Sequence, residues 1–316
     1  MNDQIDSIPW VEKYRPTHFD DIVLDPINRF LFKSILDKKY FPNLLFYGPP
    51  GTGKTTTIIN LIHEFQLRYS RPNKSNVIHL NASDERGIDI IRNQIFSFVK
   101  SLNLFETGLK FVVLDEVDYM TKNAQQALKL LLQTSSNNVR YCLICNYISK
   151  IDESLQNEFM CIRFNQLPKS DIYAFMKNIA TNENININEK TIDVIMSMYQ
   201  SDIRSMINFM QLNQNFKTED WNSTVMNRDL LEKMHDVIHG NGSLIEVLHF
   251  IHNISVRYNM DKKHIIQHYF NYVIRYRSDL LNVEFLNIVK ETIHNTSANL
   301  DTVIYYFVTR LREPSV

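Results

Sequence analysis

Residues 48–55, Gly-Pro-Pro-Gly-Thr-Gly-Lys-Thr, have the residue types and the spacing of a phosphate-binding loop. This short stretch contains three of the seven glycines of the 316-residue chain. Glycine lets successive backbone N–H groups turn toward one anion. Lys54 adds a positive charge near the β- and γ-phosphates, and the hydroxyl of Thr55 can ligate Mg²⁺. The loop therefore predicts binding of a nucleoside triphosphate; the alternative is an ordinary glycine turn before a helix.

A pair of carboxylates follows about sixty residues later. The stretch "KFVVLDEVD" reads as an apolar strand that ends in Asp115 and Glu116. The carboxyl ends of parallel strands are where α/β sheets bind ligands. Asp115 can therefore hold Mg²⁺ through water, and Glu116 can polarise an attacking water. Without the preceding loop, such a pair is more often a solvated turn.

The elements that would position these groups are indicated by apolar patterns and by chain breakers. Apolar runs at 43–48, 76–83, 110–116 and 140–147 alternate with helical stretches at 54–66, 88–102 and 121–133, which predicts a mainly parallel sheet covered on both faces. Eight of the nine prolines lie at or before Pro168, and only Gly240 and Gly242 follow before Pro314. That breaker-poor half is predicted to be all-helical, with four helices at 244–256, 264–276, 284–293 and 300–311.

Composition excludes several classes of protein. The chain is 44% hydrophobic and 22% charged, which is typical of a globular protein. No apolar run of eighteen residues and no signal peptide is found, and three cysteines favour a reducing intracellular compartment. The formal charge of −1 means that any nucleic-acid contact must come from a local patch.

Two constellations resemble metal sites but are predicted not to be. Cys142 and Cys145 form a C-x-x-C within a strand, where residues three apart point to opposite faces. The pairs His235/His239 and His264/His268 have zinc-like spacing, but no cysteine or acidic residue obviously completes a site. Packing or surface roles are favoured for these histidines.

Several longer motifs are more distinctive than the loop. They are "PWVEKYRP" (9–16), "DDIV" (20–23), "LNASDERGID" (80–89), "LDEVDYMTKNAQQAL" (114–128), "CNY" (145–147) and "SDIRSMINFMQ" (201–211). Their order and spacing resemble the small subunits of replication factor C, the sliding-clamp loader, which are AAA+ ATPases. The resemblance runs from Pro9 to about Gln211, and the last 90 residues resemble the family only in being helical.

The resemblance implies a fold of three domains. We expect an α/β P-loop AAA+ domain at 1–167, a helical lid at 168–228 and an all-α C-terminal collar domain for oligomerisation at 229–316. It implies ATP and Mg²⁺ as ligands, and as partners the other subunits of a hetero-oligomer, most simply a pentamer, the sliding clamp and primer–template DNA. It also implies a location at the site of DNA replication, which is the nucleus in a eukaryotic cell.

The resemblance also assigns roles to single positions. The catalytic assignments are Glu116, the first sensor Asn146 and the second sensor Arg204. Nucleotide binding falls on Val11 and Val23 around the adenine, on Gly48, Pro49, Pro50, Gly51, Thr52, Gly53, Lys54, Thr55 and Thr56, and on both sensors, with Thr55 and Asp115 at the metal. Arg86 and Arg92 fall where the family grips DNA phosphates, and Ile95 and Phe98 where it contacts the clamp. The two arginines could instead be solvated or paired with Asp84 and Glu85. The two apolar residues could instead be packed in the core.

One segment departs from the family. "SLQNEFMCIRF" (154–164) places Asn157, Glu158 and Phe159 where most small subunits carry Ser-Arg-Cys. The arginine of that motif reaches the neighbouring subunit's ATP, and a glutamate cannot replace it. We therefore expect a weak ATPase when the chain is alone. A structural subunit that binds nucleotide without hydrolysis, and a phosphoryl transferase that uses the same loop, are the alternatives.

Overall fold

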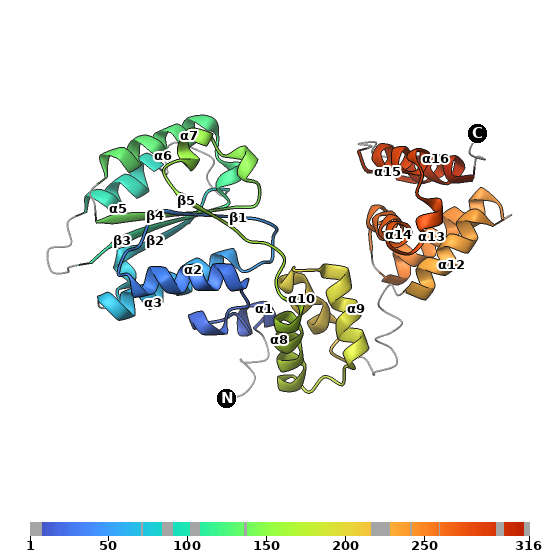
Figure 1. Cartoon of the computed structure of the whole chain (residues 1–316), viewed down its shortest axis with the longest axis horizontal. Helices are drawn as coiled ribbons and strands as arrows, with labels where there is room; N and C mark the ends of the chain where they lie inside the picture. Colours follow the sequence, from blue (N-terminus) through green and yellow to red (C-terminus); the bar gives the residue numbers. More distant parts are fainter. Residues whose placement is uncertain are drawn as a thin grey trace. The chain divides into compact units, whose positions relative to one another are not determined.

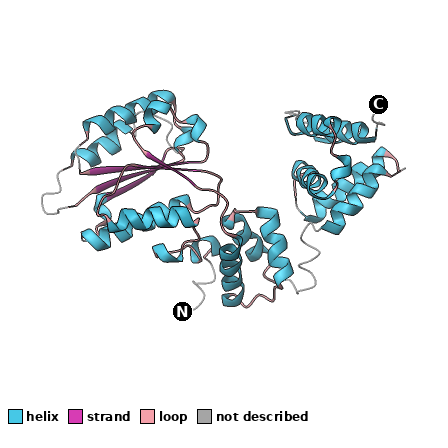
Figure 2. Cartoon of the chain, viewed as in Figure 1, coloured by secondary structure: helices cyan, strands magenta, loops and turns pink. Residues whose placement is uncertain are grey.

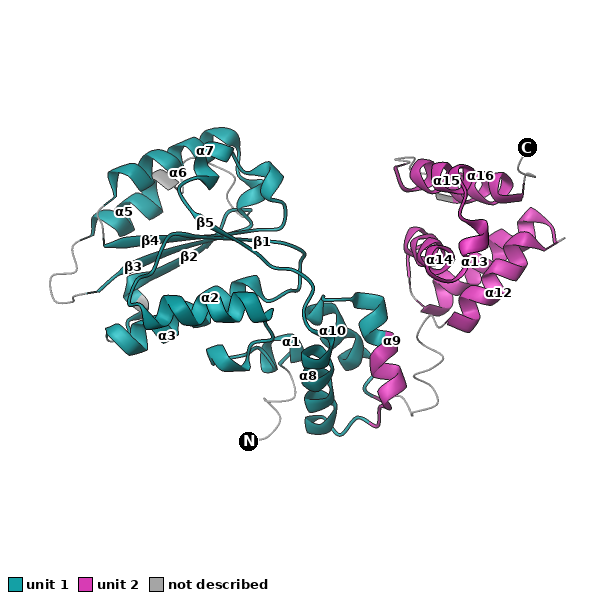
Figure 3. Cartoon of the chain, in the orientation of Figure 1, with its two compact units in different colours: residues 1–185, 195–214 teal, residues 186–194, 215–316 magenta. Residues whose placement is uncertain are grey.

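The computed structural model of the chain describes residues 8–70, 72–83, 91–101, 108–135, 138–215, 228–240, 242–258, 260–294 and 300–312. By contacts the chain divides into two compact units, residues 1–185 with 195–214 and residues 186–194 with 215–316 (Figure 3). Helices α8 (Lys169–Asn182) and α10 (Ile203–Leu212), which lie in the segment predicted to be the lid, thus group with the α/β part. The three-domain division of the sequence stays a prediction.

The first unit contains a sheet, drawn in magenta in Figure 2. It has five parallel strands in the order β2-β3-β4-β1-β5. Its strands are β1 (Leu44–Tyr47), β2 (Val77–Asn81), β3 (Lys110–Asp115), β4 (Val139–Cys145) and β5 (Met160–Arg163). The register pairs Phe46 with Ile144 and Leu114 with Leu143. The predicted parallel sheet is confirmed, and all four of the predicted apolar runs form strands.

Helices cover both faces of the sheet (Figure 1). On one face lie α2 (Pro26–Asp37) and α3 (Lys54–Tyr69). On the other lie the π-helical turn η3 (Ile91–Ile95), α5 (Phe96–Lys100), α6 (Lys122–Thr134) and α7 (Glu153–Gln156). Alternate strand residues feed the two cores: Phe46 and Val113 pack under α2 and α3, whereas Leu45 and Val112 pack under α6. This division of the strand residues confirms that the sheet is buried on both faces.

The two strand cysteines follow the same alternation. Cys142 belongs to the core under α2 and α3, and Cys145 to the core under α6. The two sulfurs therefore point to opposite faces, as expected, and burial raises the pKa of both thiols. Across the described residues no group of three or more metal-ligating side chains is found.

Short elements, and helices of the segment expected to form the lid, complete the first unit. They are α1 (Trp10–Lys13), η1 (Phe19–Asp21), η2 (Lys74–Asn76), η4 (Val117–Tyr119), η5 (Ile148–Lys150), α8 (Lys169–Asn182), α10 (Ile203–Leu212) and part of α9 (Glu189–Tyr199). The helix α1 is joined to the lid by hydrogen bonds from Lys13 Nζ and Tyr14 OH to Glu183, both 2.5 Å long. None of the helices in the described ranges is long and apolar enough to span a membrane.

The second unit is a helical bundle around its own core. Its described helices are α12 (Arg228–His239), α13 (Leu244–Tyr258), α14 (Lys262–Tyr276), the turn η6 (Ser278–Leu280), α15 (Val283–His294) and α16 (Leu300–Arg312). The four helices expected from the sequence are present. Helix α12, which carries the pair His235/His239, begins at the proposed boundary at 228.

The histidine pair on α12 lies at the boundary of this core, with His235 buried and His239 exposed. His235 is buried, and its Nδ1 lies 3.0 Å from the hydroxyl of Tyr269 on α14. The rings of His235 and His239 are 4.4 Å apart, and the Tyr269 hydroxyl lies 3.4 Å from His239 Nε2. His235 therefore has a packing role and His239 a surface role, and these are the two kinds of role favoured for this pair.

These histidines make the stability of the bundle depend on pH. Burial lowers the pKa of His235, His239 and His268 from the ordinary 6.5. The unfolded chain therefore takes up protons here at a higher pH than the folded chain does. The stability that the neutral rings contribute is present above about pH 6.5 and is lost as the pH falls toward the lowered values. The protection factors of the α12 and α14 amides, which are exchange rates corrected for the intrinsic rate at each pH, are expected to fall below that pH for this reason.

A matched pair of variants checks the source of this effect. His235→Gln removes one buried ring and is expected to flatten the dependence of the α12 protection factors on pH. His252→Gln removes a histidine that is exposed on α13 and is expected to leave it unchanged. An equal pH dependence in both variants would assign the effect to other groups.

Candidate nucleotide-binding site

The loop between β1 and α3 is held in a conformation that needs glycine. Gly48, Gly51 and Gly53 have φ angles of +140°, +72° and +83°. A β-carbon built on Gly48 would lie 2.2 Å from the carbonyl oxygen of Phe164, so the loop passes against the segment after β5 without room for a side chain. Gly53 is the N-cap of α3. The loop therefore enters the helix with its backbone turned as the phosphate-binding pattern predicts.

The first residue of α3, Lys54, is buried beside this loop. Its Nζ donates to the carbonyls of Gly48 at 2.9 Å and Pro49 at 2.7 Å, and to Asn146 Oδ1 at 3.0 Å. All three acceptors are neutral oxygens. Burial lowers the pKa of Lys54, the charge of Asp115 acts to raise it, and the positive charge of Arg204 acts to lower it further. Lys54 and Arg204 also line the same cavity, and two cations in one cavity favour an anion between them.

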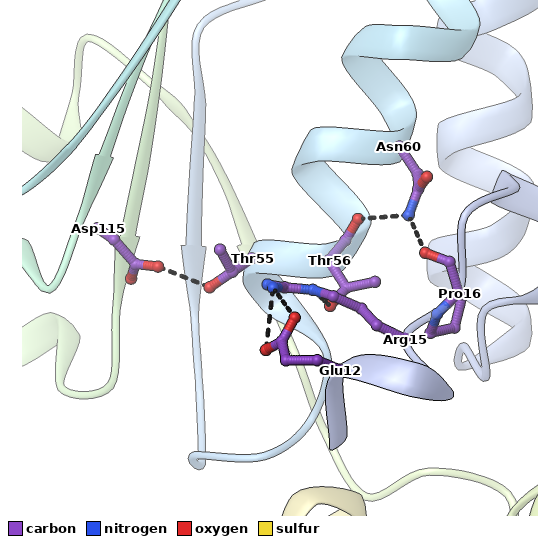
Figure 4. Close-up of polar contacts among 7 residues, drawn as sticks. All are labelled: Glu12, Arg15, Pro16, Thr55, Thr56, Asn60 and Asp115. Atoms are coloured by element: carbon purple, nitrogen blue, oxygen red, sulfur yellow. Dashed lines mark hydrogen bonds and ion pairs between the residues drawn. The ribbon is translucent and has the colours of Figure 1, made fainter. Parts of the chain in front are cut away.

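The acidic pair lies where β3 ends. Thr55 Oγ1 donates to Asp115 Oδ2 at 2.6 Å (Figure 4), and the backbone N–H of Glu116 donates to Asp115 Oδ1 at 2.8 Å. Glu116 adopts the left-handed conformation, with φ 56° and ψ 37°, before η4 begins. That conformation costs a non-glycine residue about 1 kcal/mol or more, and such residues often occur at functional sites.

The sheet order brings these groups together. β1 lies next to β4, and β4 lies next to β3. The loop after β1, Asp115 at the end of β3 and Asn146 after β4 therefore meet at one edge of the sheet. This edge is the one at which α/β sheets bind ligands.

These residues line a cavity of about 260 Å³ within the first unit. The predicted residues Val11, Val23, Pro50, Gly51, Thr52, Gly53, Lys54, Thr55, Thr56, Asp115, Glu116, Asn146 and Arg204 all line it. Gly48 and Pro49 contribute their backbone carbonyls, which accept hydrogen bonds from Lys54 Nζ. The lid contributes Arg204 from the first turn of α10, together with Ile207 and, from α8, Phe175.

Several lining residues were not assigned from the sequence, notably Glu12, Tyr14 and Arg15. Arg15 Nε donates to Thr56 Oγ1 at 3.3 Å, and its Nη1 lies 3.1 Å from Glu12 Oε2 (Figure 4). Asn60 Nδ2 donates to the carbonyl of Pro16 at 2.9 Å and so fixes this segment on α3. Glu12, Tyr14 and Arg15 belong to the motif "PWVEKYRP", which was singled out from the sequence. A single sequence does not show that the arginine of this motif contacts α3, the helix that follows the phosphate-binding loop.

The expected DNA-contacting residues cannot be placed. Arg86 lies outside the described residues, and so does the side chain of Arg92. Both assignments stay predictions.

The expected clamp-contacting pair needs a correction. Ile95 is fully buried in the core under α6, so its side chain is core and not contact surface. Phe98 is half-buried against that core, whereas Phe96 on the same helix is 45% exposed. The apolar spacing predicts a helix here, but spacing alone does not distinguish the buried face of the helix from its exposed face.

A buried lysine fixes the end of this helix. Lys110 Nζ donates to the carbonyl of Phe98 at 2.8 Å and to the carbonyl and hydroxyl of Ser101. These acceptors lie at the carboxyl end of α5, where a positive charge is favourable. Lys110 thereby ties α5 to the start of β3.

The segment that departs from the finger motif lies between α7 and β5. Asn157 and Glu158 are exposed, and Phe159 is buried in the core under α6. Glu158 Oε1 accepts from Gln133 Nε2 at 3.4 Å. The middle position of the motif is thus a surface side chain, and here it carries a negative charge.

The family model for the ATPase family associated with various cellular activities (AAA) matches residues 44–167, from β1 to just beyond β5. The fold and the site are thus those of an AAA-class P-loop ATPase. A protein called replication factor C small subunit 2, from Pyrobaculum arsenaticum, is 39% identical over 240 residues, which are 73% of each chain. The chain belongs to the replication factor C small-subunit family.

Other relatives match a shorter region. Replication factor C small subunit of Thermofilum pendens is 42% identical over 64% of this chain and 61% of its own length. Human replication factor C subunit 5 is 38% identical over 66% of this chain and 61% of its own length. Two solved structures of Thermotoga maritima RuvB variants share the fold, with TM-scores of 0.52 and 0.51 at 12% identity, over 83% of this chain and 91% of theirs.

Proposed function

We propose that the chain is an ATP-binding and ATP-hydrolysing subunit of a sliding-clamp loader that acts in DNA replication. The observation that carries this proposal is the setting of Lys54, which is buried beside the glycine loop and lines the same cavity as Arg204. Within the described residues its hydrogen bonds go to neutral oxygens. A triphosphate is the anion that this loop, these cations and the polar edge of the sheet suit.

The residues also suit Mg²⁺. The Thr55 hydroxyl and the Asp115 carboxylate lie 2.6 Å apart in the cavity, and both are the oxygen ligands that Mg²⁺ prefers. Thr55 would ligate the ion directly and Asp115 through water. When bound, Mg²⁺ supplies neutralisation of the phosphate charge that develops during transfer.

Each of the site residues then has its own role in binding or hydrolysis. Lys54 and Arg204 bind the β- and γ-phosphates, Asn146 orients the attacking water, and Glu116 polarises that water. Val11 and Val23 enclose the adenine. Contacts with the γ-phosphate would favour one arrangement of lid and loop, and hydrolysis would release it.

The family supports assembly with other clamp-loader subunits around DNA. Arg86 and Arg92 are proposed to bind template phosphates, α5 to contact the clamp through Phe98, and the second unit to form the collar. Native mass spectrometry of the chain with co-purifying partners tests the assembly, since isolation as a stable monomer without partners would contradict it.

The nucleotide site has a direct test. Lys54→Ala is expected to weaken ATP binding roughly tenfold to a hundredfold, because hydrogen bonds to a charged group contribute about 1.5–3 kcal/mol. Titration calorimetry with Mg-ATP measures the affinity. Lys110→Ala is the matched control, because it removes another buried ammonium outside the cavity and is expected to leave the affinity unchanged. Equal affinities for wild type and Lys54→Ala would refute the assignment.

A further inference from the structure

The segment that joins α9 to α10 lies directly against the phosphate-binding loop. The backbone N–H of Ile203 donates to the carbonyl of Gly51 at 3.3 Å. A β-carbon built on Gly51 would lie 1.8 Å from Asp202 Oδ1 and 3.0 Å from Asp202 Cα. Gly51 therefore has to be glycine for two reasons, its positive φ angle and the close approach of Asp202.

Asp202 also begins the helix that carries the second sensor. Its carboxylate caps α10, accepting from the Ser205 N–H at 3.1 Å and from Ser205 Oγ at 2.7 Å. Both carboxylate oxygens are thus engaged with the first turn of α10. Arg204 lies within that turn and lines the cavity.

The lid helix has two further attachments inside the first unit. At the junction before it, the Leu167 N–H donates to Ser201 Oγ at 3.0 Å. Near its other end, Gln211 Oε1 accepts from the N–H of Trp10, which is buried, at 3.0 Å. With its start on the loop and its end on α1, α10 cannot turn without disturbing one of these contacts.

We propose that Asp202 is a positioning residue, whose contact with Gly51 holds α10 so that Arg204 points into the nucleotide cavity. Through the same contact, occupancy of the phosphate-binding loop is transmitted to the lid. The inference rests on the proposed ATP-binding function.

The contact can be tested first without nucleotide. In a Trp221→Phe background, Trp10 is the remaining tryptophan of the chain and reports on the packing of α1 against α10. Asp202→Ala is expected to shift its emission to the red and to speed hydrogen exchange in the first turn of α10 roughly fivefold, the effect of one lost N-cap. Asp202→Asn keeps a capping oxygen and is expected to restore both.

A matched control shows whether the effect is specific to the N-cap of α10. Asp261 caps α14 in the second unit by accepting from the Lys263 N–H at 3.0 Å. Asp261→Ala is expected to leave Trp10 emission and α10 exchange unchanged. Unaltered emission and exchange in Asp202→Ala would overturn the inference.

The transmission is tested by the ratio of ATP to ADP affinity. Arg204→Ala is expected to lower this ratio roughly tenfold, and Asp202→Ala by a similar factor. If Asp202 acts through Arg204, the double variant loses no more than about twofold beyond either single variant. Ser205→Ala keeps the contact with Gly51 and is expected to keep the ratio. If the double variant lowers the ratio by the product of the two single-variant factors, Asp202 does not act through Arg204.

The two proposals fail in different ways. If the wild-type chain binds neither nucleotide, the proposed function fails, and the measurements without nucleotide still decide whether Asp202 holds α10. If the wild type binds ATP and Asp202→Ala keeps the wild-type ratio, the positioning role alone is wrong.

Discussion

Glu116→Gln is expected to leave ATP bound and to slow its hydrolysis by roughly a hundredfold or more in the assembled complex. The amide keeps the size of the side chain, and the backbone N–H of residue 116 still donates to Asp115 Oδ1, so the metal-side geometry is retained. What is lost is the carboxylate that polarises the attacking water. Single-turnover release of phosphate, measured beside nucleotide affinity, separates the chemical step from binding.

The control for this variant is another carboxylate of the same unit. Glu64 lies on α3, pairs with Arg68 at 2.9 Å and does not line the cavity. Glu64→Gln is expected to change turnover by less than about twofold, as surface substitutions of this kind have small effects. Near wild-type turnover by Glu116→Gln would assign the water to another residue, or show a subunit that binds nucleotide without hydrolysing it.

The parts of the site that follow from local pattern could be predicted from the sequence. A glycine loop after an apolar run fixes the place of Lys54, and an apolar run that ends in two carboxylates fixes the place of Asp115. Parallel strands bring such ends to one edge, so these groups had to meet. The opposite faces of Cys142 and Cys145 follow from the same alternation of strand residues.

The parts that depend on tertiary contact could not be predicted. The close approach of Asp202 to Gly51 joins residues about 150 positions apart, and each looks locally complete, one as a turn glycine and one as an N-cap. Arg15 reaches Thr56 because the segment after α1 lies against α3. The burial of Ile95 depends on which side of its turn meets α6, and a period of 3.6 residues leaves that choice open.

The exposed position of Glu158 gives the prediction with the largest expected effect. In a ring, a neighbour's ATP would meet a carboxylate at this surface, where the family presents an arginine. A finger arginine contributes about 10³–10⁵ in rate in other phosphate-hydrolysing proteins. The unmixed chain is therefore expected to hydrolyse ATP very slowly, and mixing it with finger-bearing partners is expected to raise turnover by up to about 10³. DNA-stimulated phosphate release, measured at matched subunit concentrations, compares the two preparations.

A substitution at Glu158 tests the absence of a finger arginine without partner subunits. Glu158→Arg is expected to raise turnover of the unmixed chain by at least about tenfold, provided that the subunits associate, because the new cation replaces a repelling charge beside the γ-phosphate. Glu153→Arg places the same change of charge on α7, five residues away, where Glu153 is exposed, and is expected to have no such effect. The exposed side chain of Arg163, on the edge strand β5, is the nearest arginine that could act instead. Robust hydrolysis by the unmixed wild type, abolished by Arg163→Ala, would transfer the finger role to that strand.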